Sequence, residues 1–314
     1  MDRFLLQLML AKGIGNAAIK KILNDVKINS SRLFEDYCKD AVLLESVLYR
    51  PGSVSDVQQS IAANNETAKL LSNELNNQGI VVITETDDDY PKKLKNKLGK
   101  NCPPVLFLKG NKNLLNSCSV GFCGSRKVSD KGAVITDQCA RQLVNNNITV
   151  VSGYASGADI AAHTAALEEG GNTVFVLAEG ILEYKIKNEV RHYLNNDKHL
   201  FVSQFLPDAG WSPSNAMRRN SLIIGLSKAM ILVESGKSGG TFAAGTESLK
   251  RDLPLFVIDY AKPEVSAEAN PYFIKNGGNP IRSRGGLPNI DAVIGLSDNE
   301  DGAKEENGKQ LSMF

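Results

Sequence analysis

The sequence has few cysteines, and they are not arranged to bind a metal or to form paired disulfides. There are five of them, an odd number, and none forms a CxxC pair. Common zinc sites and disulfide frameworks need such spacing or even pairing. We therefore expect no metal, no cofactor held by thiolates, and a location in the reducing cytoplasm.

Long apolar runs and a strong charge of one sign are also missing. No stretch approaches the roughly 20 apolar residues of a membrane span, so we expect no membrane contact. The formal net charge is +1, and residues 297–314 hold five acids and two lysines, which leaves 34 basic and 30 acidic side chains in residues 1–296. Any surface that binds nucleic acid must then be a local patch.

The N-terminal segment has apolar residues at helical spacing on both sides of Gly13-Ile14-Gly15. This pattern predicts two helices joined by a tight turn, within a helical domain over residues 1–65. The segment resembles a helix-hairpin-helix, in which glycines let backbone N–H groups approach a DNA phosphate. A plain packing turn has the same signature, so both interpretations stay open.

From about residue 79 the chain alternates short β-branched runs with amphipathic segments. This alternation predicts an α/β fold with a parallel sheet, in a domain over residues 66–290. Ser129 is expected to cap a helix that ends at 145–147. Residues 291–314 are polar and acidic and are expected to form a disordered tail. The six runs are IVVIT (80–84), SVGFC (119–123), ITVVS (148–152), TVFVLA (173–178), AMILVE (229–234) and PLFVID (254–259).

Three of these runs end in turns rich in glycine and serine, and a pair of arginines precedes the helix before the fifth run. In a doubly wound sheet, ligands bind outside the carboxyl ends of the strands, where N–H groups and guanidinium groups can hold phosphates. Taken singly, each segment could equally reflect tight packing or a solvated face, and none matches GxxxxGK[ST] or GxGxxG. The segments are Gly124-Ser125-Arg126-Lys127, Ser152-Gly153, Arg218-Arg219-Asn220 and Ser238-Gly239-Gly240-Thr241.

Two further residues have plain structural interpretations. His163 has no histidine at metal-ligand spacing and no partner nucleophile, so a packing or hydrogen-bonding role is favoured over catalysis. Asp159 stands at the start of a predicted helix, where a carboxylate can cap N–H groups. We expect no catalytic residue in this chain.

In this order the four segments resemble the DprA/Smf family. Further segments carry the resemblance: YPKKL (90–94), CPPVLFLKG (102–110), GADIAAH (157–163), SQFLP (203–207) and RRNSLIIGLS (218–227). The resemblance implies a helical domain joined to an extended Rossmann-like domain, a non-enzymatic pocket for single-stranded DNA, a homodimer, and transfer of the DNA to RecA in natural transformation. The sequence does not identify the pathway, the recombinase or the dimer interface.

The resemblance also implies the position of the pocket. The family's glycine-serine-arginine segment falls on Gly124, Ser125 and Arg126, its second turn on Ser152 and Gly153, and its arginine-asparagine motif on Arg219 and Asn220. A tyrosine-proline-x-x-asparagine segment of the family is replaced by residues 184–188, which lack the proline and add two cations, of which Lys185 is predicted to contact DNA.

Two other functions compete with this one. Phosphoribohydrolases of the same fold carry a similar arginine pair and glycine turn, but cleavage of an N-glycosidic bond needs a nearby carboxylate. Here Phe242, Ala243 and Ala244 follow the turn, and Glu247 comes too late to match. A sensor that binds a nucleotide in the same crevice also stays open.

The final five residues predict a partner. Gln310, Leu311, Met313 and Phe314 resemble the bacterial sliding-clamp-binding motif, with Met313 in place of its second leucine. That exchange nearly conserves volume. A chance terminal pentapeptide is the alternative.

Overall fold

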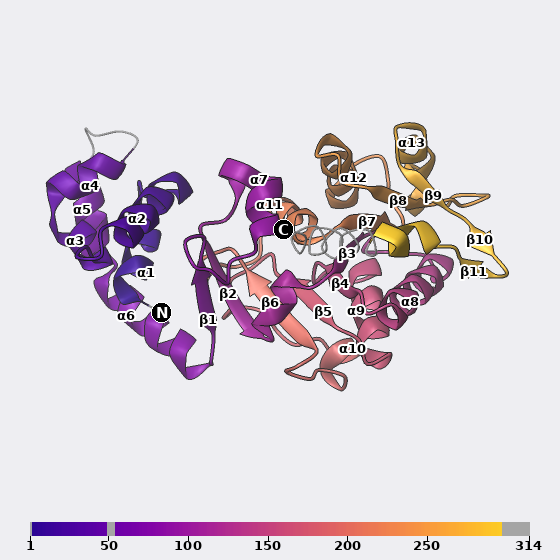
Figure 1. The fold of residues 1–314 in the computed structure, drawn as a ribbon, viewed down its shortest axis with the longest axis horizontal. Coiled ribbons are helices and arrows are strands. Elements are labelled where there is room, and N and C mark those ends of the chain that lie inside the picture. Colours follow the sequence, from indigo (N-terminus) through magenta and orange to yellow (C-terminus); the bar gives the residue numbers. More distant parts are fainter. Residues whose placement is uncertain (1, 49–53, 297–314) are drawn as a thin grey trace, which may run out of the picture.

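The N-terminal part of the protein is a cluster of six helices. The computed structural model describes residues 2–48 and 54–296, and Figure 1 shows this cluster at one end of the molecule. Leu6, Ile22 and Leu44 are fully buried inside it. The helices are α1 (Arg3–Leu10), α2 (Asn16–Ile28), α3 (Phe34–Lys39), α4 (Ala41–Val47), α5 (Val54–Ala63) and α6 (Asn65–Asn77).

The hairpin expected around Gly13 is present between α1 and α2, and Gly13 has a φ of +93°. Helix α6 packs against α1, and its Leu75 shares one apolar core with Leu5 of α1 and with Ile80. We therefore propose that the helical domain ends in the turn at residues 78–80, later than the expected boundary at residue 65.

A nine-stranded sheet forms the rest of the described protein. Its order is β1-β2-β6-β5-β4-β3-β7-β8-β9. The pairs β1–β2 and β2–β6 are antiparallel, and all pairs from β6 to β9 are parallel. The strands are β1 (Val81–Thr84), β2 (Val105–Gly110), β3 (Ser119–Cys123), β4 (Thr149–Ser152), β5 (Thr173–Val176), β6 (His199–Ser203), β7 (Ala229–Leu232), β8 (Leu255–Ile258) and β9 (Asn279–Ile281); β10 (Ser283–Arg284) and β11 (Leu287–Pro288) pair separately.

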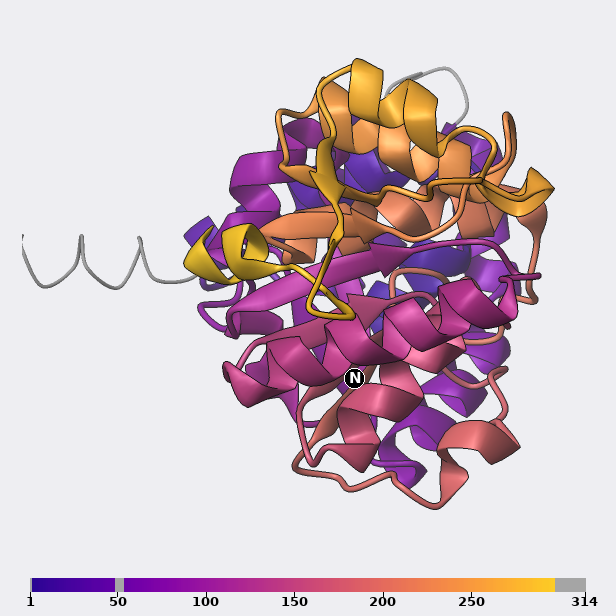
Figure 2. The same cartoon turned by 90° about the vertical axis from the view of Figure 1, so that its right-hand side faces the viewer.

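Helices cover both faces of this sheet (Figures 1 and 2). The apolar side chains of the parallel strands alternate between the faces: Val174 and Val176 belong to one core cluster, and Phe175 to another. Both faces are therefore buried, as parallel sheets require. One layer holds α7 (Lys92–Leu98), α11 (Pro213–Leu226), α12 (Gly240–Lys250) and α13 (Asn270–Lys275), and the other holds α8 (Asp130–Asn145), α9 (Ala158–Glu168) and α10 (Asn188–Arg191).

The predicted α/β fold class is confirmed, and all six β-branched runs contain strands. Ser129 caps α8 as expected, because its hydroxyl accepts a bond from the N–H of Gly132. The runs did not indicate β2 and β6, which pair antiparallel to each other. Residues 291–296, expected in the disordered tail, are helical, and they are held to the sheet domain by the fully buried side chain of Val293.

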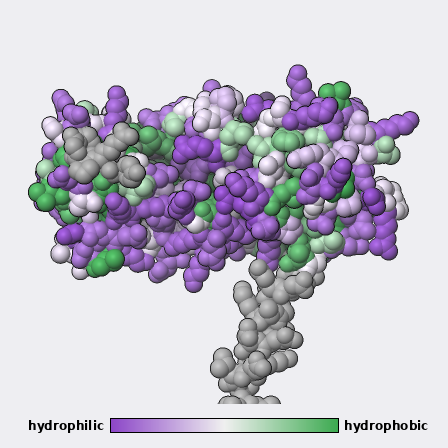
Figure 3. Space-filling model, turned by 90° about the horizontal axis from the view of Figure 1, so that it is seen from above, coloured by the Kyte–Doolittle hydropathy of each residue, from purple (hydrophilic) through white to green (hydrophobic). Residues whose placement is uncertain are grey.

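The face shown in Figure 3 is mostly hydrophilic. The exposed large apolar residues of the described chain occur in both parts of the protein, for example Ile28 and Val42 in the helical cluster and Trp211 and Val265 in the sheet domain. Within residues 2–48 and 54–296, no helix is long and apolar enough to cross a membrane.

His163 joins α9 to two strands of the sheet. Its side chain is 0% exposed, its Nε2 donates to the carbonyl of Gly153 at 2.7 Å, and its Nδ1 pairs with the Thr173 hydroxyl at 2.6 Å. The expected packing role agrees with these contacts. Burial lowers the pKa of His163 to about 3.

This buried histidine predicts acid sensitivity. Between pH 7 and pH 5 the unfolded chain takes up a proton near its ordinary pKa of about 6.5, whereas folded His163 stays neutral, so the free energy of unfolding falls by about 2 kcal/mol. Urea unfolding at both pH values should show this loss in the wild type, in excess of that in His163→Asn. An equal loss in both proteins would show that His163 is not the group responsible.

Candidate nucleic-acid interface

The turns that the sequence singled out meet at the switch point of the sheet. Strand β3 lies between β4 and β7: the chain continues from β3 through β4 to β6 on one side, and from β7 to β9 on the other side. Such a point opens a crevice at the carboxyl ends of the strands. A hollow of about 620 Å³ lies there, and nine of the predicted residues line it: Gly124, Ser125, Arg126, Arg219, Asn220, Ser238, Gly239, Gly240 and Thr241.

The turn after β3 is fixed by its contact with the start of α9. The N–H of Ala158 donates to the carbonyl of Ser125 at 3.2 Å. Gly157 has a φ of +81°, and a Cβ at this position would lie 2.3 Å from the same carbonyl oxygen. Only glycine fits this close approach, which holds Ser125 and Arg126 at the rim of the hollow.

Arg219 is the most unusual side chain of the hollow. It is only 7% exposed, and its Nη1 lies 3.9 Å from the carboxylate of Asp159. Its Nε has no hydrogen-bond partner among the described residues. Burial lowers the pKa of Arg219, and the nearby Asp159 opposes this effect. A buried guanidinium with spare donors is a binding group for an anion.

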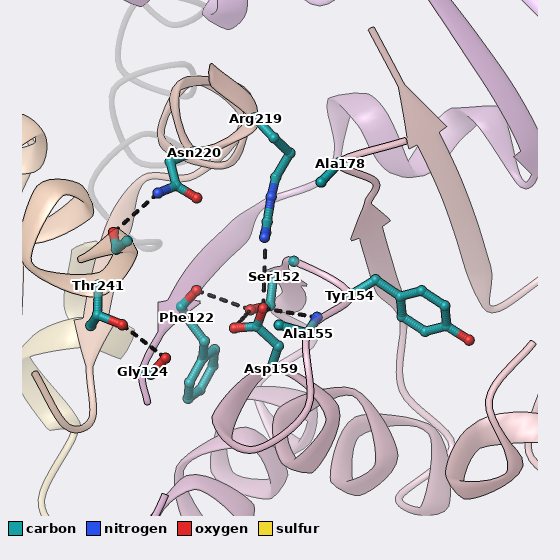
Figure 4. Close-up of polar contacts among 12 residues, drawn as sticks. Phe122, Gly124, Ser152, Tyr154, Ala155, Asp159, Ala178, Arg219, Asn220 and Thr241 are labelled. Carbon is teal, nitrogen blue, oxygen red and sulfur yellow. Dashed lines mark hydrogen bonds and ion pairs between the residues drawn. The ribbon is translucent and has the colours of Figure 1, made fainter. Parts of the chain in front are cut away.

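Gly153 and Ser152 form the seat of this arginine, behind the lining of the hollow. A Cβ on Gly153 would lie 1.6 Å from Nη1 of Arg219. The Ser152 hydroxyl lies 3.0 Å from the carbonyl of Phe122 and 2.9 Å from Asp159. Figure 4 shows Arg219 reaching from α11 toward Asp159 and Ser152. Gly153 therefore leaves the space that Arg219 occupies, and Ser152 bonds to Asp159 beside it.

Asn220 and Thr241 brace the walls of the hollow. The amide of Asn220 donates to the carbonyl of Gly240 at 3.1 Å, and the hydroxyl of Thr241 donates to the carbonyl of Gly124 at 2.9 Å (Figure 4). These bonds tie α11 to α12 and α12 to the turn after β3. The N-terminus of α12 has no side-chain cap, so its backbone N–H groups are left for an anion.

Besides Ser152 and Gly153, three of the predicted residues do not line the hollow. Lys127 and Lys185 are exposed, and the guanidinium of Arg218 lies 5.4 Å from the centre of the Phe205 ring. None of the three lines this hollow or the smaller one beside it. Their contact with DNA stays a prediction.

A second hollow of about 210 Å³ shares Arg126, Trp211 and Arg219 with the first. It adds Lys187, whose Nζ donates to the carbonyl of Tyr154 at 2.8 Å. Burial lowers the pKa of Lys187, and it raises the pKa of Glu179 on the opposite wall. From this segment Lys185 was the residue predicted to contact DNA, and no sequence pattern indicated Trp211.

The carboxylates of the hollow have internal partners. Asp159 accepts a bond from the N–H of Ala155 at 3.3 Å and pairs with Ser152. Asp159 does not cap α9 as expected, because the N-cap position, Gly157, has no side-chain cap bond. The carboxylate instead accepts from an N–H before the helix and lies 3.9 Å from Arg219. Burial raises the pKa of Asp159. Glu234 accepts bonds from the N–H and the hydroxyl of Ser129.

No group of three or more His, Cys, Asp or Glu side chains within the described residues is placed to hold a metal ion. Arg126, Arg219 and the glycine-rich turn at residues 238–241 line the hollow, so guanidinium and backbone N–H groups are available there to an anion.

Comparisons with curated proteins show relatives over this region. DNA processing protein DprA of Streptococcus pneumoniae is 30% identical over 63% of this chain and 69% of its own length. DprA of Bacillus subtilis is 27% identical over 58% of this chain. The match covers 61% of the Bacillus protein and 52% of protein Smf of Synechocystis.

Solved structures show the same fold. DprA of Streptococcus pneumoniae has a TM-score of 0.75 at 24% identity and covers 90% of this chain and 95% of its own. DprA of Helicobacter pylori, whose structure was described for its single-stranded DNA binding mode, has a TM-score of 0.59 at 23% identity and covers 70% of this chain and 96% of its own.

The family model described as DNA recombination-mediator protein A matches residues 81–286. This range spans the whole nine-stranded sheet, β1 to β9, and includes the hollow at the switch point. The chain therefore belongs to the DNA recombination-mediator protein A family, the DprA/Smf proteins.

Proposed function

We propose that this protein binds single-stranded DNA through its phosphates at the switch-point hollow. The observation that carries the proposal is Arg219, which is buried with an unpartnered Nε and faces the hollow. A phosphate placed there would accept bonds from Arg219 and from Arg126 at the rim. Two guanidinium groups and the open N-terminus of α12 together suit an anionic phosphate of the strand.

The hollow favours a flexible backbone over a rigid duplex. Its polar donors sit inside a crevice, where the phosphates of a single strand can enter one by one. The Helicobacter pylori relative, described as binding single-stranded DNA, supports this choice. The exposed Lys127, Lys185 and Arg218 would meet the strand beyond the hollow.

We infer further that the protein acts as a recombination mediator in the cytoplasm. Family membership supports this role. In natural transformation it would protect incoming DNA as a homodimer and load a RecA-type recombinase. Contact with RecA can be tested by measuring whether this chain speeds the assembly of RecA on coated DNA.

The hydrolase and nucleotide-sensor functions have less support. Glu234 is held by Ser129 and Asp159 by Ser152 and Ala155, while Glu247 pairs with Arg251 on α12. None of these carboxylates is left for a ribose. Free base released from nucleoside monophosphates, and lost on substitution of Glu234 or Asp159, would establish an enzyme instead.

Binding of a strand through its phosphates should weaken as salt rises. If three phosphates are neutralised, affinity for a single-stranded oligonucleotide should fall roughly 20-fold between about 50 and 200 mM salt. Fluorescence anisotropy should also show weaker binding of a blunt duplex of the same length. Salt-independent binding, or equal affinity for both ligands, would contradict the proposal.

The same assay tests the position of the pocket. Arg126→Glu removes a charge-assisted bond and adds repulsion, so affinity should fall at least about tenfold while the melting temperature stays close to that of the wild type. Lys275→Glu is the matched control, because Lys275 is also exposed but lies on α13, outside the hollow. Equal losses for both variants would place the DNA elsewhere.

We also propose that the C-terminal pentapeptide binds the bacterial sliding clamp. These residues lie outside the described part of the chain, so the proposal rests on their sequence. Gln310 would bond at the rim of a clamp pocket that Leu311, Met313 and Phe314 fill. The linkage to a DNA-binding body would raise the effective concentration of the motif near DNA.

Calorimetry with the clamp of the source organism tests this proposal. The full-length protein should bind with modest affinity, since fixing a short peptide in one conformation costs entropy. A version lacking residues 310–314 should not bind, and Phe314→Ala should bind more weakly. Equal binding by all three proteins, or by none, would rule out the motif.

A further inference from the structure

Trp211 stands where the two hollows meet. It is the only tryptophan of the chain, and it lines both hollows. Its side chain is 52% exposed, although a large apolar ring gains most by burial. An indole left in solvent at the mouth of an anion-binding crevice is available to a ligand.

The other aromatic residues of the two hollows are not available in this way. Within the described chain, Phe122 and Tyr154 are the other aromatic side chains that line them. Phe122 is 0% exposed and Tyr154 is 9% exposed, and the Tyr154 ring packs edge-on against Phe175 and Phe201. Trp211 is thus the aromatic surface that the hollows offer to a strand.

The local backbone holds Trp211 in place. Helix α11 begins two residues later, and the hydroxyl of Ser212 caps it by accepting a bond from the N–H of Asn215 at 3.0 Å. The guanidinium carbon of Arg126 lies 5.3 Å from the centre of the indole ring. The ring is therefore positioned beside a phosphate-binding group before any ligand arrives, which lowers the entropic cost of binding.

We propose that an unpaired base of the bound strand stacks on Trp211, so that this residue makes the site select single-stranded DNA. The proposal rests on the proposed function and deepens it. With one phosphate at Arg126 and Arg219 and a neighbouring one near Lys187 in the second hollow, the strand between them crosses the indole. A base that is stacked and paired within a duplex cannot turn onto this ring.

Stacking of this kind distinguishes single-stranded from duplex DNA, but it does not distinguish one base sequence from another. Every base has a π-face, so the contact tolerates all four. The alternative is that Trp211 only holds Arg126 in place through its ring. The two roles predict different affinities for a strand without bases. Such a strand keeps its phosphates and loses only the stacking.

The experiment uses the full chain and two labelled oligomers of equal length, one of thymidine and one made entirely of abasic sites. The thymidine oligomer should quench the intrinsic fluorescence, which comes from Trp211 when tryptophan is excited selectively. The abasic oligomer should bind without quenching. By anisotropy it should bind about 5- to 100-fold more weakly, as expected for the loss of one stacked base.

Variants then separate stacking from positioning. Trp211→Ala should weaken thymidine binding by the same 5- to 100-fold and leave binding of the abasic oligomer unchanged, while Trp211→Phe should restore most of the affinity. Tyr272→Ala is the matched control and should change neither, because Tyr272 is also 52% exposed but lines neither hollow. Circular dichroism checks that each variant folds.

Each contrary result has a distinct meaning. Binding of thymidine without quenching, or an equal loss for both oligomers in Trp211→Ala, would overturn the stacking and leave the phosphate site standing. If neither oligomer binds the wild type, the proposed function fails and the stacking fails with it.

Discussion

Arg219 sits almost entirely out of water, and the carboxylate nearest to it is 3.9 Å away. Removing a guanidinium from water is costly unless its donors find partners. The surroundings supply them only in part, since Asp159 is shared with Ser152 and Ala155. A bound anion would supply the missing partner, so the site is arranged around a charge that the protein alone does not fully balance.

This constraint explains why small residues cluster there. Gly153 must lack a side chain for Arg219 to fit, and Gly157 must lack one for α9 to approach the turn after β3. His163 holds the carbonyl of Gly153 from the other side, so the seat of the arginine is tied to the buried core. The loop residues of the hollow are thus held in place by the rigid sheet beneath them.

The sequence indicated the sheet and the turns because β-branched runs and glycines carry local signals. It did not indicate β2, since the prolines before it suggest a loop, nor β6, whose run is short and follows a polar segment. Nothing in the sequence distinguishes Arg218 from Arg219. Helical phase does not separate them, because residues 222–226 are all buried and Leu222 lies one turn after both arginines. The burial of Arg219 depends on its contact with Gly153, which lies far from it in the sequence.

Trp211 carried no such signal, because a single aromatic residue before a helix belongs to no periodic pattern. Its proposed role in stacking depends on Arg126, which is distant in the sequence and is brought close only by the order of the strands in the sheet. Likewise, the choice between Lys185 and Lys187 depends on which of them faces Tyr154, and spacing alone does not settle this.

The bond from Thr241 to the carbonyl of Gly124 joins residues separated by 117 positions. Strands β3 to β6 come from one continuous stretch of chain, whereas β7 and α12 are added later on the other side of β3. As the ribosome releases the chain from its N-terminus, the helical domain and the first strands emerge well before the final wall of the hollow. The crevice is therefore completed late in synthesis, after most of the sheet that supports it has left the ribosome.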